Sequence, residues 1–105
     1  MAVRNVSIFQ VRPGKRQAFL SDAAAAKKIL QRLGARFRAG ETTIGGPNTG
    51  NLVVSLEFED MAAYAAFTQK AQGDSEWQAF QARVGGTADP TTTLVGRSLI
   101  TDLDV

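Results

Sequence analysis

The order of hydrophobic periodicities along the chain is the feature that most limits its fold. Alternating apolar residues indicate strands over 4–12, 36–44, 52–59 and 93–103, and apolar spacings of three and four indicate helices after Pro13 and Asp60. That order is the βαββαβ unit, in which four strands form one antiparallel sheet and both helices cover the same face. We therefore predict an α+β, ferredoxin-like domain that occupies residues 1–105 as a single unit.

Residues that begin and end helices stand at the expected places. Gly34 follows the first apolar stripe where a C-terminal cap belongs. Asp60 is the predicted N-cap of the second helix, Gly73 interrupts that helix, and Asp74 or Ser75 begins a further helical segment. The predicted buried stripes are Phe19, Ala23, Ala26, Leu30 and Leu33 in the first helix, Met61, Tyr64, Phe67, Thr68 and Ala71 in the second, and Trp77, Phe80 and Val84 in the third segment.

The composition excludes several kinds of chemistry. The chain has neither cysteine nor histidine, so it lacks disulfides, Ser-His-Asp and Cys-His nucleophile systems, and the usual ligands of haem iron and zinc. No carboxylate cluster has the spacing of a calcium loop. We expect no metal and no cofactor. Because no apolar run is long enough to span a membrane and residues 1–5 lack the apolar core of a signal peptide, we expect a cytoplasmic protein without membrane contact.

The net charge of +2 conceals an uneven distribution of charge. Residues 1–38 contain nine Lys and Arg against one acid, Asp22, whereas residues 39–105 contain three basic and nine acidic side chains. A basic half attracts anionic ligands or nucleic acid, but exposed charge is also the ordinary state of a helix surface. We interpret the basic half as a solvated surface that balances the acidic half.

One face of the predicted sheet has no cover. In strand 52–59 the apolar positions, which should meet the helices, are Leu52, Val54, Leu56 and Phe58. The residues that we assign to the opposite, uncovered face are Asn5, Ser7, Phe9, Val11, Val53, Ser55 and Glu57. A large aromatic side chain on a bare face suggests that a second copy of the sheet, a nucleic acid or a small ligand covers it.

Whether a nucleic acid covers this face can be tested against the sequence, because RNA-recognition domains have the same order of elements. Aromatic residues on their third strand stack on bases. When Phe58 is aligned with the last position of that motif, Val53 and Ser55 occupy the two outward stacking positions. Only Phe9 lies where a stacking ring belongs, and Glu57 would repel phosphate. We therefore expect no nucleic acid and keep RNA binding as the least favoured alternative.

A second copy of the sheet is the cover suggested by a family resemblance. The resemblance begins where Pro13-Gly14-Lys15 opens the first helix directly after Gln10-Val11-Arg12. There the chain resembles the dimeric α/β-barrel superfamily, which includes antibiotic-biosynthesis-type monooxygenases and NIPSNAP-like domains. The resemblance covers the whole chain in element order, hairpin position and the late aromatic helix with Trp77 and Phe80. It implies a homodimer joined through the open sheet face, with a pocket between sheet and helices. Some members oxidise polycyclic aromatic substrates without a cofactor, and the haem-handling members use a histidine that is missing here.

The resemblance and the uncovered face together supply the candidate site residues. Monooxygenase sites of this type resemble a constellation of Asn, Trp, Arg or His around an apolar pocket, and Asn5, Trp77 and Arg97 are of those types. We predict Glu57 as the catalytic base, because desolvation on a partly apolar face raises the pKa of a carboxyl group. The predicted ligand-binding residues are Asn5, Ser7, Phe9, Arg38, Ser55, Trp77 and Arg97, with Arg38 suited to an anionic group.

Each assignment has an alternative without function. Glu57 suits an interfacial ion pair, Trp77 a place in the core, and Arg97 a pair with Glu57 or Glu59. Two functions from different classes follow. One is a dimer that binds a small apolar or aromatic molecule between sheet and helices without catalysis, and the other is a cofactor-independent monooxygenase.

Overall fold

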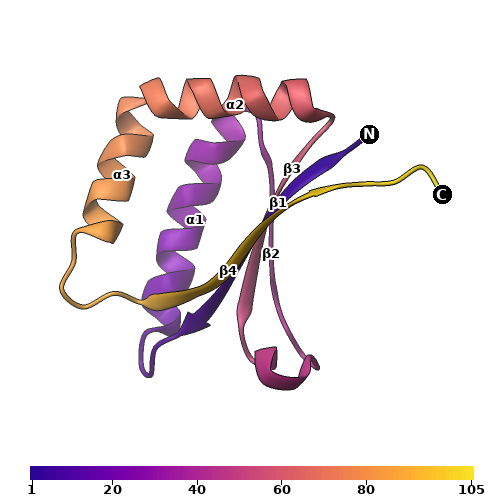
Figure 1. Ribbon diagram of the computed structural model, residues 1–105. Helices are drawn as coiled ribbons and strands as arrows, with labels where there is room; N and C mark the ends of the chain where they lie inside the picture. The colour runs from indigo at the N-terminus through magenta and orange to yellow at the C-terminus, as the bar shows by residue number, and fades with distance from the viewer.

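The computed structural model describes residues 1–105 and contains the predicted four-stranded antiparallel sheet, in the order β2-β3-β1-β4. The elements are β1 (Val3–Val11), α1 (Arg16–Arg32), β2 (Arg36–Glu41), the 3-10 helix η1 (Gly46–Asn48), β3 (Leu52–Phe58), α2 (Met61–Gly73), α3 (Ser75–Gly85) and β4 (Thr92–Thr101). The helices lie on one side of the sheet and leave the other side uncovered (Figure 1). The α+β, ferredoxin-like fold class is confirmed. No helix combines the length and apolar character needed to cross a membrane.

The helix ends follow the local signals in the sequence. Gly34 adopts φ +106° after α1, and the next residue, Ala35, donates its N–H to the carbonyl of Leu30 at 3.0 Å. The Asp60 carboxylate accepts the Ala63 N–H at 2.8 Å and so caps α2. Pro13 lies outside α1, contrary to the expectation that it opens the helix, because Pro13 and Gly14 form the turn that precedes Lys15.

The packed core lies between α1, α2 and the end of β3. Its central ring is Phe58, which is 4% exposed and lies with its centroid 4.9 Å from that of Phe67 and 5.3 Å from that of Tyr64. Met61, predicted to be buried, is 49% exposed. The contacts of α2 with the core begin only at Ala63 and Tyr64, so the first residue of the helix projects beyond them.

The face assigned to β1 from the sequence is wrong. The register pairs Val3 with Phe58, Asn5 with Leu56, Ser7 with Val54 and Phe9 with Leu52. Directly opposed residues of an antiparallel pair share a face, so the odd-numbered residues of β1, Val11 included, lie under the helices. The uncovered face instead holds Arg4, Val6 and Ile8, opposite Glu57, Ser55 and Val53. Both faces of β1 mix apolar and polar residues, so alternation alone does not orient this strand.

The edge strand β4 pairs with β1 and contains a bulge. Ile8 is opposite Gly96, but Phe9 is opposite Leu94, so Val95 is an additional residue in β4. Beyond the bulge Arg97 lies opposite Ser7 and therefore on the helix-covered face. The register settles the faces of this strand, which its sequence leaves ambiguous.

The two oppositely charged parts of the chain are joined by ion pairs. All seven pairs link a residue of 1–38 to a residue of 39–105: Arg4–Asp102, Lys15–Asp89, Arg16–Glu41, Asp22–Arg83, Arg32–Asp74, Arg32–Glu76 and Arg36–Glu57. The acidic part thus balances the basic part within one chain, in agreement with our interpretation of the uneven charge.

Candidate functional site

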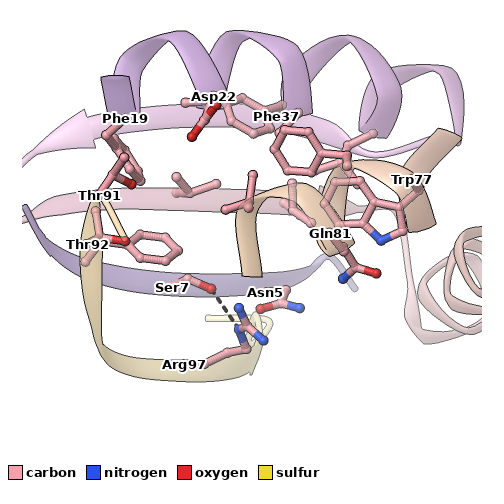
Figure 2. Close-up of a pocket in the computed structure, with 18 of the residues that line it drawn as sticks. Asn5, Ser7, Phe19, Asp22, Phe37, Trp77, Gln81, Thr91, Thr92 and Arg97 are labelled. Atoms are coloured by element: carbon pink, nitrogen blue, oxygen red, sulfur yellow. Dashed lines mark hydrogen bonds between the residues drawn. The ribbon is translucent and has the colours of Figure 1, made fainter. Parts of the chain in front are cut away.

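A cavity of about 290 Å³ lies between the helix-covered face of the sheet and the helices, beside the packed core. All four strands and all three helices contribute to its lining. Six aromatic rings line it: Phe9, Phe19, Phe37, Phe67, Trp77 and Phe80. Its polar lining consists of Asn5, Ser7, Asp22, Gln81, Thr91, Thr92 and Arg97. The labelled members of both sets surround the cavity in Figure 2.

The α3 side of the cavity is a flat aromatic surface. Trp77 and Phe80 are stacked, with centroids 5.3 Å apart and planes at 11°. The guanidinium carbon of Arg83 lies 5.3 Å from the Phe80 centroid, and an Arg83 Nη1 donates to Asp22 of α1 at 3.2 Å. Arg83 therefore links α3 to α1 through the Asp22 carboxylate, and its guanidinium also lies over the Phe80 ring of its own helix.

The β1 side of the cavity is polar. Arg97 Nε donates a hydrogen bond to Ser7 Oγ at 2.9 Å, and Asn5 lies beside this pair (Figure 2). Ser7 is only 7% exposed. Asn5 Oδ1 is buried and has no hydrogen-bond partner. A buried acceptor without a donor costs about 1–3 kcal/mol, so the fold gives up stability at Asn5, beside the cavity.

The alternation of β1 explains why these groups lie together. Side chains two residues apart point to the same face of a strand, so Asn5, Ser7 and Phe9 form one row. The register then places Arg97 of β4 next to the middle of that row. Two polar residues and one aromatic residue on one strand thus make a surface that is apolar at one end and hydrogen-bonding at the other.

Of the two charged side chains in the lining, one has an ion-pair partner and the other has none. Asp22 is paired with Arg83. Arg97 takes part in none of the ion pairs, and its side chain forms a hydrogen bond with the neutral Ser7 hydroxyl. The cavity therefore carries one unneutralised positive charge, on the side that β4 provides.

The resolved pKa shifts lie at the supports of the cavity and not in it. Two hydrogen bonds from Arg32, at 2.8 and 2.9 Å, and one from the Trp77 N–H lower the pKa of Asp74 below its ordinary value. The hydrogen bonds to Asp74, with one to Glu76, raise the pKa of Arg32. A hydrogen bond from Lys15 lowers the pKa of Asp89. These ionised groups fix the start of α3 and the loop that leads to β4.

The structure brings five of the predicted site residues together and separates three. Asn5, Ser7, Phe9, Trp77 and Arg97 all line the cavity. The remaining three, Arg38, Ser55 and Glu57, lie on the uncovered face.

Glu57 therefore stands across the sheet from the cavity, too far to act on a ligand held there. It pairs instead with Arg36, at 3.5 Å between nitrogen and oxygen. This pair lies within one chain and is not the interfacial ion pair considered for Glu57, and the pairing considered for Arg97, with Glu57 or Glu59, is not formed.

The lining residues that sequence reasoning did not assign to the site include Phe19, Asp22, Phe37 and Gln81. Asp22 had a usable signal, because it is the single acid of residues 1–38 and stands three positions after Phe19 on the same face of α1. Gln81 had a similar signal, since it follows Trp77 by four positions on α3.

A second, shallower hollow of about 400 Å³ adjoins the cavity and shares Asn5, Phe67, Trp77 and Gln81 with it. The rest of its lining comes from α2 and α3, at Tyr64, Thr68, Ala71, Gln72 and Gln78. It holds four carboxamide side chains and no charged one. Within the structure no group of three or more acidic side chains is placed to hold a metal ion.

Comparison with known proteins identifies the fold. No protein-family model matches the chain, and no curated protein matches it in sequence. Solved structures do match over nearly the whole chain. A NIPSNAP family protein from Agrobacterium tumefaciens is 20% identical, with 98% of this chain and 87% of that chain covered and a TM-score of 0.71. The chain shares its fold with that protein.

Two further structures extend the likeness. The Rv0793 protein of Mycobacterium tuberculosis is 19% identical, with coverage of 100% and 98% and a TM-score of 0.66. A putative antibiotic biosynthesis monooxygenase from Bordetella bronchiseptica is 15% identical, with 97% of each chain covered and a TM-score of 0.63. At these identities the likeness shows a shared ferredoxin-like fold, as the resemblance in the sequence implies, and leaves the reaction and the ligand to the site itself.

Proposed function

We propose that the chain binds a small apolar or aromatic molecule in the cavity between its sheet and its helices. The observation that carries this proposal is a cavity of about 290 Å³ lined by six aromatic rings. Small-molecule sites are concave, largely apolar and supplied with a few convergent polar groups. Asn5, Ser7 and Arg97 supply such groups at one side.

Trp77 provides the means to test binding, because it is the only tryptophan and it lines the cavity. A protein labelled with nitrogen-15 gives one indole N–H cross-peak in a two-dimensional NMR spectrum. We expect 2-naphthol, an uncharged two-ring probe at neutral pH, to shift this cross-peak with a dissociation constant below about 100 µM, or about −5.5 kcal/mol.

Two neighbouring alanines of α1 give a matched pair of variants. Ala23 lines the cavity, whereas Ala24 is exposed. Ala23→Leu should fill space that the ligand needs and abolish the shift, and Ala24→Leu should leave it unchanged. An indole cross-peak that does not move at millimolar 2-naphthol contradicts the proposal.

We propose further that the uncovered face of the sheet joins two copies of the chain in a homodimer. Val6, Ile8 and Val53 form an apolar centre on a face that no helix covers, and Ile100 of β4 is 38% exposed beside it. Light scattering should give twice the chain mass of 11.2 kDa. Ile8→Lys should reduce that mass by half, whereas Ala24→Lys, on the helix side, should not. A wild-type protein that scatters as a single chain contradicts the dimer.

One observation favours a second candidate function, cofactor-independent oxidation of an aromatic substrate. Asn5, Trp77 and Arg97, the residue types of the monooxygenase constellation, line one cavity. Anthrone is a suitable probe, because its ring methylene reacts with O2 to give anthraquinone and one molecule of water. Catalysis predicts anthraquinone formation above the buffer rate that is lost in Asn5→Leu and kept in Ala24→Leu. Formation at the buffer rate leaves binding as the function.

A further inference from the structure

We infer that the ligand of this cavity carries an anionic oxygen, as in a carboxylate or an ionised phenol, and that Arg97 binds it. The inference rests on the proposed function, because it concerns a ligand of the same cavity. It adds that the ligand of this largely apolar cavity bears a negative charge.

Arg97 stands apart from the other arginines in its surroundings. Of the eight arginines, five form ion pairs with carboxylates, namely Arg4, Arg16, Arg32, Arg36 and Arg83. The three without such a pair are Arg12, Arg38 and Arg97. Arg12 is exposed beyond the end of β1 and Arg38 lies on the uncovered face, so Arg97 alone presents an unneutralised guanidinium to the cavity.

The hydrogen bond to Ser7 leaves Arg97 arranged for an anion. Nε is taken by Ser7 Oγ at 2.9 Å, and Ser7 is buried in the sheet. In the anchored guanidinium both terminal amino groups remain without a hydrogen-bond or ion-pair partner in the chain. Two parallel N–H donors on one edge match the two oxygens of a carboxylate.

No other lining residue carries a positive charge that would compete for the anion. Asn5 Oδ1 only accepts hydrogen bonds and is buried, so it does not attract the anion. Asp22 lies on the α1 side, away from Arg97, and is neutralised by Arg83 (Figure 2). The ligand is thereby oriented, with its anion towards β4 and its rings towards α1 and α3.

The position of Arg97 also limits the cost of desolvating the anion. The Arg97 side chain is exposed although its Ser7 partner is buried. A carboxylate bound there keeps part of its hydration while the attached rings leave water. Full burial of an unpaired carboxylate would be far more costly.

Two probes with the same rings test the charge directly. 2-Naphthoate is ionised at neutral pH, and 2-naphthamide is neutral with similar shape. Titrations that follow the Trp77 indole cross-peak should give a dissociation constant about tenfold or more lower for the anion. Raising the sodium chloride concentration should weaken the binding of 2-naphthoate and leave the binding of 2-naphthamide unchanged.

Variants locate the effect at one residue. Arg97→Gln should lose the preference for 2-naphthoate and bind 2-naphthamide within about twofold of the wild type. Arg97→Lys keeps the charge without the planar fork and should retain part of the preference. Arg12→Gln is the matched control, because Arg12 is unpaired but lies outside the cavity lining, and it should retain the full preference.

The outcomes separate this inference from the proposal on which it rests. If 2-naphthamide binds as tightly as 2-naphthoate, or if Arg12→Gln loses the preference as much as Arg97→Gln, the anion site is overturned and the apolar site stands. If no naphthalene probe moves the cross-peak, both are overturned. The wild-type comparison of probes and salt decides the charge class even where the Arg97→Gln protein does not fold.

Discussion

The neighbouring strands β1 and β3 pair residue by residue and face the same helices, yet they meet those helices in different ways. At one end Val3 and Phe58 are opposed, both almost fully buried, and the layer is filled. At the centre Asn5 and Ser7 of β1 lie opposite apolar residues of β3, and the layer is hollow. Polar side chains on a helix-covered strand thus mark the place where close packing ends and a cavity remains.

The largest expected effect tests the filled end. Phe58→Ala should lower the free energy of unfolding by about 3–5 kcal/mol, because it removes a buried ring that two other rings contact. Phe9→Ala should cost less, since the Phe9 ring contacts Phe19 but also borders the cavity. Urea denaturation of both variants measures the difference. Equal losses would remove the contrast between the two strands.

The second effect should have the opposite sign. Asn5→Leu removes a buried oxygen without a partner and places apolar atoms in the cavity. The free energy of unfolding should rise by about 1 kcal/mol, while binding of 2-naphthol should weaken. The same urea titration and the Trp77 cross-peak report the two quantities. If the Asn5→Leu protein is less stable than the wild type, then the polar side chain of Asn5 does not lower the stability of the fold.

A pH-dependent effect tests the support of the cavity at α3. The hydrogen bonds from Arg32, and then that from the Trp77 N–H, lower the pKa of Asp74 in the folded state, so its ionised form stabilises the fold at neutral pH. That stability is present above the pKa of Asp in an unfolded chain, about 3.9, and is lost as the pH falls through the lower folded value.

Asp74→Asn retains a good capping residue but removes the charge. It should melt at a lower temperature than the wild type at neutral pH, and the two melting temperatures should converge in acid. Thermal melts followed by circular dichroism across this pH range check the prediction. A gap that persists unchanged at low pH would assign the effect to the cap and not to the charge.

The smallest effect concerns the exposed ion pairs around the site. Arg16 of α1 and Glu41 of β2 lie 2.8 Å apart, with side chains 55% and 42% exposed. Arg16→Gln should change the free energy of unfolding by no more than about 0.5 kcal/mol. A change of the size expected for Asn5→Leu would mean that an exposed ion pair affects the stability of this fold as much as a buried polar group in β1 does.

The same contrast separates what the sequence predicts from what it does not. The apolar alternation of β3 and the caps at Gly34, Asp60 and Asp74 depend on neighbouring residues only, and the structure agrees with them. β1 is different, because Val6 and Ile8 are apolar on one face while Phe9 is aromatic on the other. Its orientation is decided by its register with β3, which no local pattern contains.

The candidate site was also predictable only in part: its residue types follow from the sequence, but the face on which they lie does not. Asn5, Trp77 and Arg97 were identified by residue type, and the structure places all three on one cavity. Glu57 was assigned on the premise that the uncovered face holds the site, and the wrong face of β1 led to that premise. The cavity itself depends on how far α3 stands from the sheet, which is set by contacts between elements distant in the sequence, such as Arg32 with Asp74 and Asp22 with Arg83.

The ion pairs that join the two parts of the chain also bear on its synthesis. Residues 1–38 leave the ribosome first, with nine basic side chains and one acid. Neither of the strands that pair with β1 has then been made, since both β3 and β4 follow later. The nascent segment therefore has neither its counter-charges nor a sheet to join, and α1 is the one element that it can form early. Folding is completed only when the last strand emerges, so a ribosome that stalls before β4 holds a chain whose β1 edge is still open to other partners.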